Sequence, residues 1–180
     1  MRSLRGNLLV ASPHLPDPNF FRSVVLIVEH QEDGALGLIL NRVSPQKLMD
    51  VWETASEQPC LSDQYLRIGG PVHGPLMALH SHPELDGQEI VPRVLFSSER
   101  RVLEALAGQT EHRFEMFTGY AGWGGGQLEG EMKIGGWLVT PATWQIVFQL
   151  DEQTLWQQTV NAIGSEITRD VLQIRKLPED

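Results

Sequence analysis

The sequence contains one cysteine, no long hydrophobic run and few basic side chains. Cys60 has no partner within the chain for a disulfide, which is usual for proteins of a reducing compartment. The longest unbroken aliphatic run, residues 24–28, is far shorter than the roughly 20 residues that cross a bilayer. The apolar stretch at residues 8–11 is also shorter than the roughly 7–15 residues of a signal peptide. These absences predict a cytoplasmic protein without a membrane span.

Positive charge is scarce, because 14 lysines and arginines face 23 aspartates and glutamates, for a formal net charge of -9. Such a chain repels nucleic acid phosphates at long range. The best helix-turn-helix candidate, residues 151–176, contains Arg169, Arg175 and Lys176, but acidic side chains nearby largely cancel their charge. We therefore do not expect sequence-specific DNA binding.

The remaining composition is that of an ordinary globular protein. With 180 residues, 41% hydrophobic and 21% charged, the chain fits one domain with a substantial core. We assign residues 1–164 to this domain and residues 165–180 to a polar C-terminal tail.

Two apolar runs and the turn between them predict a β-hairpin. Residues 23–30 and 35–42 are rich in β-branched and aliphatic side chains, and QEDG between them contains the Asp33-Gly34 pair typical of tight turns. Both runs are apolar on both faces. We therefore expect them in the middle of a sheet that is covered on each side.

Helical spacing and further apolar runs complete the expected organisation. Ser44 followed by Pro45 is typical of a helix start, and a last helix is expected from Asp151 to Gly164. Residues 65–70 and 75–81 are expected to be strands joined by a tight turn. Strands interleave with helices without a strict βαβ order, so the predicted class is α+β.

The stretch GYAGWGGGQLEGE, residues 119–131, has the glycine content of a phosphate-binding loop but not its chemistry. Gly125 and Gly126 stand where a Walker A loop needs lysine and serine or threonine, and the dinucleotide pattern fails as well. The only charged side chains are Glu129 and Glu131, which would repel a phosphate. We predict a structural turn from a strand into a helix, and no nucleotide cofactor.

Histidines and carboxylates offer weak metal and catalytic candidates. His80 and His82 would share one face of a strand near His73, but Pro83 follows at once and no cysteine is near, so we predict no metal site. Glu129 and Glu131 stand two residues apart and would not face each other on a helix.

No nucleophile has a recognisable setting either. Neither Ser23 nor Ser97 lies in a Gly-x-Ser-x-Gly elbow, and nothing around Cys60 resembles a catalytic cysteine motif. Partners of a triad can be distant in sequence, so an enzyme stays an alternative.

Several blocks in order make the chain resemble the YqgE/AlgH family. They are GNLLVASPHLPDPNFFRSVVLIVEHQEDGALGLILNR, GGPV, GYAGWGGGQLEGE and GGWLVTPA, and the resemblance covers residues 6–164. It implies a single α+β domain with a bent, bifurcated mixed sheet that forms a partial barrel flanked by helices. The run Gly124 to Gly126 and Gly130 depart from the usual pattern, and glycine weakens a helix there.

The resemblance also supplies the candidate binding residues. These are Asp17, Arg22, His30, Asn41, Arg42, Tyr120, Trp123, Gln127 and Glu129.

We expect a non-enzymatic binding or regulatory protein that recognises a protein or a small ligand. The first alternative is an enzyme whose site assembles from Asp17, His30 and Arg42. The second is a DNA-binding transcriptional regulator, a label that some members of the family carry. Trp123 could be a core residue or an anchor for a partner, and we favour the core because glycines let the chain pack around it.

Overall fold

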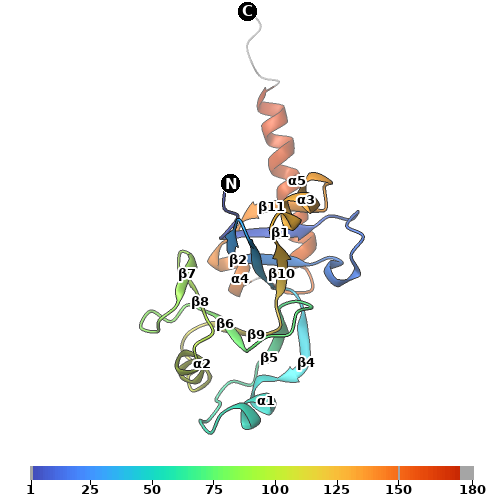
Figure 1. Cartoon of the computed structure of the whole chain (residues 1–180). Coiled ribbons are helices and arrows are strands. Elements are labelled where there is room, and N and C mark those ends of the chain that lie inside the picture. The colour runs from blue at the N-terminus through green and yellow to red at the C-terminus, as the bar shows by residue number, and fades with distance from the viewer. Residues whose placement is uncertain (1, 150, 175–180) are drawn as a thin grey trace, which may run out of the picture.

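The fold consists of two β-sheets and five α-helices among residues 2–149 and 151–174, the part of the chain that the computed structural model describes (Figure 1). The α+β class and the single domain are confirmed. Within these residues the sheets stay separate and do not close into a barrel. No helix in the same ranges has the length and apolar character needed to span a membrane.

The first sheet is antiparallel throughout and contains the predicted hairpin. Its order is β10 (Ala121–Gly124), β3 (Gly34–Ile39), β2 (Val24–Gln31), β1 (Asn7–Ala11) and β11 (Trp137–Pro141). The apolar run of β2 is central, as expected. The turn consists of Glu32 and Asp33 rather than Asp33 and Gly34, because Gly34 already pairs with Gln31.

The second sheet is mixed. Its order is β4 (Val43–Lys47), β5 (Tyr65–Ile68), β9 (Phe114–Thr118), β6 (Met77–His80), β8 (Val94–Ser97) and β7 (Gln88–Val91). Strand β9 runs parallel to β5 and antiparallel to β6. The tight turn expected at residues 69–71 is therefore wrong, because the connection from β5 to β6 must cross β9. Strands β7 and β8 are not among the elements predicted from the sequence.

The helices cover the outer faces of the sheets and close one side of the space between them. They are α1 (Leu48–Ala55), α2 (Arg100–Ala107), α3 (Gln127–Lys133), α4 (Trp144–Phe148) and α5 (Leu155–Ile174), with a single 3-10 turn η1 at Pro18–Phe20. Helices α1 and α2 lie below the second sheet in Figure 1, and the far half of α5 projects from the body.

Two helix boundaries differ from the sequence prediction. Ser44 and Pro45 belong to β4, whose pairing with β5 delays α1 until Leu48. Proline is tolerated there because β4 is an edge strand. The last helix begins at Leu155 and passes through Gly164 to Ile174, so its expected end at Gly164 is wrong. Residues 175–180 of the predicted tail lie outside the described residues.

Three apolar layers hold the fold together. The central layer lies between the sheets and joins Leu26 and Leu38 to Leu79 and Phe117, with α4 and α5 packed on it. A second layer packs Leu128 of α3 against the outer face of the first sheet. A third, formed by α1 and α2, covers the outer face of the second sheet. The two sheets thus form one body rather than two domains.

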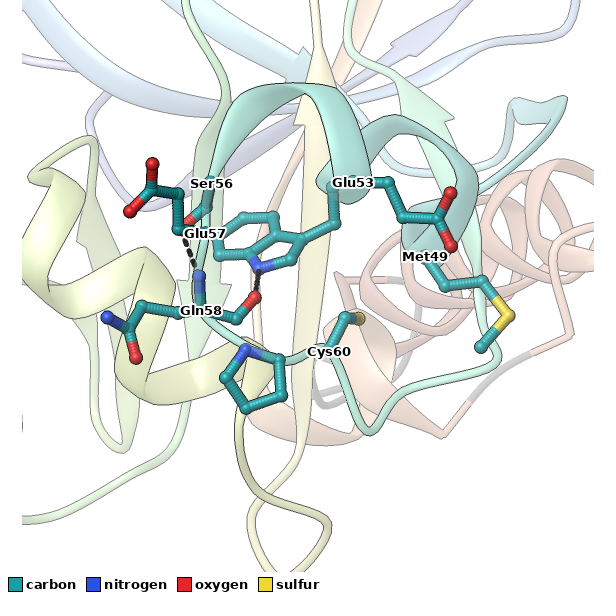
Figure 2. A pocket seen from close by; sticks show the side chains of 8 residues that line it. Met49, Glu53, Ser56, Glu57, Gln58 and Cys60 are labelled. Carbon is teal, nitrogen blue, oxygen red and sulfur yellow. Dashed lines mark hydrogen bonds between the residues drawn. The ribbon is translucent and has the colours of Figure 1, made fainter.

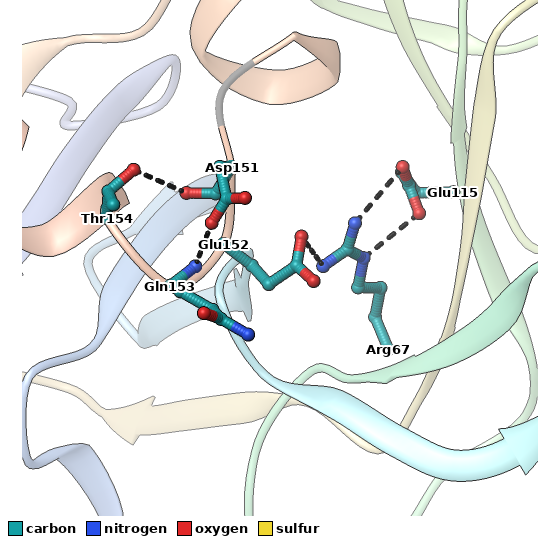
Figure 3. Close-up of polar contacts among 6 residues, drawn as sticks. All are labelled: Arg67, Glu115, Asp151, Glu152, Gln153 and Thr154. Carbon is teal, nitrogen blue, oxygen red and sulfur yellow. Dashed lines mark hydrogen bonds and ion pairs between the residues drawn. The ribbon is translucent and has the colours of Figure 1, made fainter.

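A charged clamp links the second sheet to the segment between α4 and α5 (Figure 3). The Arg67 Nε atom donates to Glu115 at 3.0 Å, and its Nη1 lies 3.5 Å from a Glu152 carboxylate oxygen. Burial alone would lower the pKa of Arg67, but the two carboxylates outweigh it and raise that pKa. The guanidinium therefore keeps its charge and holds the two segments together.

Candidate functional site

The nine candidate residues do not form one site, because β2 separates them into groups. Strand β2 spans eight residues, which at about 3.3 Å per residue separates its ends by about 23 Å. One group lies before β2 and after β3, a second lies where β2 meets β3 and α3, and Tyr120 lies between the sheets. The first group is Asp17, Arg22, Asn41 and Arg42, the second is His30, Gln127 and Glu129, and Tyr120 stands alone. Trp123 lies on β10 beside the second group, but its ring reaches Phe20, which is two residues from Arg22.

His30 is a buried connector between the N-terminal segment, β2 and α3. The backbone N–H of Leu4 donates to His30 Nδ1 at 2.9 Å. Because Nδ1 accepts, the proton of the neutral ring lies on Nε2, which donates to Glu129 at 2.8 Å. The pKa of Glu129 is lowered, first by its own backbone N–H and then by His30. Both ring nitrogens of His30 are engaged, so neither can serve as a base for a substrate.

Trp123 is a core residue, as the favoured interpretation expected. It is 5% exposed, stacks on Phe20 at 5.7 Å between ring centroids and meets Trp137 edge-on at 6.0 Å. A carboxylate oxygen of Glu131 accepts both indole N–H groups, at 3.0 Å from Trp123 and 2.8 Å from Trp137. The Gln127 amide donates to the other oxygen at 3.1 Å. The polar groups of this cluster therefore satisfy one another.

The glycine-rich stretch has a structural role. Residues 121–124 form β10 at the edge of the first sheet, and Gly126 then adopts a φ of 77° before α3. The predicted passage from a strand into a helix is confirmed, and residues 121–124 of the stretch themselves form the strand. Helix α3 forms despite Gly130 in its interior.

Tyr120 and the GGPV motif lock the two sheets together. A Cβ on Gly70 would overlap the backbone of Tyr120, so only glycine allows the two chains to approach this closely. The Tyr120 ring lies against Gly74 and Gly122, where an added Cβ would come within 3.0 Å and 3.2 Å of ring carbons. Tyr120 is therefore partly buried, and it has a structural role together with the GGPV motif.

At the other end of β2, Asn41 fixes an unusual backbone conformation. Its Oδ1 accepts from Val24 N at 2.9 Å, and its Nδ2 donates to Arg22 O at 2.8 Å. Arg22 has a φ of 50°, in the left-handed region that only a few per cent of residues other than glycine occupy. Non-glycine residues in this region are strained, and such strain is frequent at binding sites. The side chain of Asn41 therefore holds a strained turn in place.

The strained turn displays an aromatic residue whose ring faces one arginine and whose carbonyl faces another. Phe21 is 67% exposed, and the Arg22 guanidinium lies between the Phe21 ring at 5.2 Å and the Trp156 ring at 5.3 Å. Arg42 extends toward the Phe21 carbonyl, at 3.5 Å. Burial lowers the pKa of Arg42, and the charge of Asp17 opposes that shift. We call Asp17, Phe21, Arg22, Arg42 and Trp156 the Phe21 surface.

Sequence reasoning found three members of the Phe21 surface and missed two. Phe21 follows the buried Phe20, and nothing in the pair FF indicates which ring points outward. Trp156 fits the apolar stripe of α5, yet its Nε1 donates to Ala11 O at 2.8 Å and its ring faces Arg22. The signal that could have found them is an aromatic residue beside arginine.

The residues proposed for an enzyme do not converge. His30 lies at one end of β2, whereas Asp17 and Arg42 lie at the other. Ser23 is fully buried and its hydroxyl donates to Phe20 O at 2.9 Å. His80 is fully buried on β6, and His82 contacts the His112 ring at 4.1 Å between centroids. Asp17 and Arg42 therefore do not lie together with His30.

Comparisons with known proteins agree with the fold. The AlgH-like family model matches residues 8–168. A UPF0301 protein from Stenotrophomonas maltophilia is 37% identical over 175 residues, which cover 93% of each chain. One from Myxococcus xanthus is 35% identical over 169 residues, covering 91% of this chain and 93% of the relative.

Two solved structures are also similar. The solution structure of the AlgH protein from Pseudomonas aeruginosa has a TM-score of 0.72 and 30% identity, with all of both chains covered. A crystal structure of a protein from Corynebacterium diphtheriae has a TM-score of 0.70 and 26% identity, covering 88% of this chain and 86% of that one. With a family model that matches most of its length, the chain belongs to the AlgH-like family.

Proposed function

We propose that this protein is a non-enzymatic binding protein that recognises a partner protein through the Phe21 surface. The observation that carries the proposal is the 67% exposure of Phe21 on a backbone that Asn41 holds in a strained conformation. A large aromatic side chain that is held rigidly in water loses little conformational freedom when a partner covers it.

The composition of the surface supports this role. Tryptophan, tyrosine and arginine dominate the energetics of protein interfaces, and well-packed aromatic anchors lie near their centres. The Phe21 ring, the two arginines and the edge of Trp156 provide such a centre on a chain with a net charge of -9. Because both arginines are cations, the partner carries carboxylates opposite them.

The bonding of the other motif residues favours a binding role over catalysis. The polar groups of His30, Asn41 and Trp123 are bonded within the protein and offer no reactive atom. The overall negative charge also disfavours a DNA-binding regulator. A regulatory role would therefore act through protein contacts, and the single cysteine favours the cytoplasm as its place.

Photo-crosslinking at two exposed positions tests the proposal. A benzophenone-bearing phenylalanine replaces Phe21 in one variant and Ile134, which is 77% exposed, in a matched control. We expect one discrete crosslinked protein from position 21 in living cells and none from position 134. Arg42→Glu in the same chain should abolish that product, because it reverses one charge beside the anchor.

Stability measurements keep the test interpretable. Phe21 and Ile134 are exposed, so both variants should unfold within about 0.5 kcal/mol of the natural chain in urea. If the position 21 variant is stable but yields no crosslinked protein, or the same crosslinked proteins as position 134, the proposal is wrong.

A further inference from the structure

A second surface lies on the outer face of the second sheet, between α1 and the segment that follows α1 in the sequence. The cavity there has a volume of about 600 Å³, and eight residues of these two segments line it: Met49, Trp52, Glu53, Ser56, Glu57, Gln58, Pro59 and Cys60. Figure 2 shows Met49 and Glu53 on one side and Ser56, Glu57 and Gln58 on the other, with Cys60 below. We call this feature the α1 groove.

The walls of the α1 groove are tied together within the protein. Trp52 Nε1 donates to Gln58 O at 2.9 Å, and Ser56 N donates to Trp52 O at 2.9 Å. The Ser56 hydroxyl also donates to Glu104 of α2 at 2.8 Å. The groove is therefore formed before any partner arrives, which lowers the entropy lost on binding.

The floor of the groove is apolar and its rim is acidic. Met49 is 37% exposed, Trp52 beneath the groove is 4% exposed, and Leu61 directly after the groove is 59% exposed. Methionine adapts its shape and is frequent on surfaces that receive amphipathic helices. Glu53 and Glu57 form no ion pair among residues 2–149 and 151–174.

Neighbouring cations do not neutralise this rim. Arg100, on α2, is already paired with Glu104, with 2.9 Å between its Nε and the carboxylate. Lys47 lies over the Tyr65 ring, with its Nζ 5.8 Å from the ring centroid. The apolar floor is therefore bordered by two carboxylates that are free to attract a positive charge.

We propose that the α1 groove binds a cationic, amphipathic helical segment of a partner protein. Apolar side chains of the segment contact Met49 above the buried Trp52, and its lysines or arginines pair with Glu53 and Glu57. The charge complementarity selects this partner over an acidic helix, which the rim would repel. The rim of the α1 groove is acidic, whereas the Phe21 surface contains two arginines. Binding at the groove is therefore a separate proposal that does not depend on the function proposed above.

Methyl and indole NMR signals can test the groove directly. The probes are a synthetic 14-residue leucine-lysine helix and a leucine-glutamate helix with the same apolar face. We expect the Met49 methyl and Trp52 indole signals to shift saturably with the lysine peptide and not with the glutamate peptide. Met132, on α3, is the internal reference and should not respond.

Two double variants separate the groove from general charge attraction. Glu53→Gln with Glu57→Gln should weaken the lysine peptide by about tenfold, since it removes two ion pairs. The matched control, Glu32→Gln with Asp33→Asn in the hairpin turn, changes the net charge equally and should leave the affinity unchanged. Either a silent Met49 signal or an equal loss of affinity in the control would overturn the proposal.

Discussion

The replacement of Trp123 by alanine tests the central packing argument. Burying a tryptophan removes about 150–250 Å² from water, which at about 25 cal/mol per Å² corresponds to about 4–6 kcal/mol. This is an upper estimate, because unfolded chains already bury part of that area. Contacts with Phe20 and Trp137 and the bond to Glu131 are also lost. We expect Trp123→Ala to lower the free energy of unfolding by about 3–5 kcal/mol.

Urea denaturation of three chains measures this effect. Trp123→Phe keeps a ring against Phe20 but removes the N–H that Glu131 accepts, so it should cost about 1–2 kcal/mol. Ile134→Ala, at an exposed position, should change stability by less than about 0.5 kcal/mol. If Trp123→Ala unfolds at the same urea concentration as Ile134→Ala, Trp123 does not belong to the core.

Three further predictions use the same measurement. Burial lowers the pKa of the His80 imidazole in the folded chain below its usual 6.5, so the unfolded chain takes up a proton there before the folded chain does as the pH falls. The free energy of unfolding should therefore decrease as the pH drops below about 6.5, and His80→Leu should make that decrease less steep. Asn41→Ala should cost about 1–3 kcal/mol, since it leaves the Val24 N–H without its partner. Gly130→Ala should stabilise the protein by about 0.5–1 kcal/mol, because the added Cβ meets nothing within 4 Å. Gly70→Ala should prevent folding, because its Cβ would overlap the Tyr120 backbone. Equal stability of these two variants would contradict the different roles assigned to the two glycines.

Local sequence patterns were enough to predict the parts of the fold that depend on nearby residues. The hairpin of β2 and β3 follows from two apolar runs and a polar turn. The passage into α3 follows from the glycines at residues 124–126. In both cases the decisive contacts lie within a few residues of one another, so the printed sequence contains the information.

Distant pairing explains most of the errors. Ser44 and Pro45 have the local pattern of a helix start, but pairing of β4 with β5, about twenty residues later, places them in a strand. The crossing from β5 over β9 likewise depends on a strand some fifty residues away. Gly164 did not end α5, because one glycine costs a helix only about 1 kcal/mol.

The candidate site shows the same division. Motif residues identified the family correctly, yet most of their side chains serve the fold. Gly70 permits a close backbone approach, Asn41 bonds two backbone groups, and His30 joins α3 to the N-terminal segment. Whether a polar side chain points inward or outward depends on partners that no local pattern specifies.

Residues that the fold does not use are therefore the better guide to function. The ring of Phe21 is 67% exposed and contacts Arg22 on one side, and the carboxylates of Glu53 and Glu57 form no ion pair within the described ranges. Each lies beside a rigid, hydrogen-bonded frame. Substitutions at such positions change binding while the fold survives, whereas substitutions at Asn41 or Gly70 change both. A screen that counts loss of function without measuring stability would rank Gly70 above Phe21 and would misplace the site. Function has to be assigned from variants that remain folded.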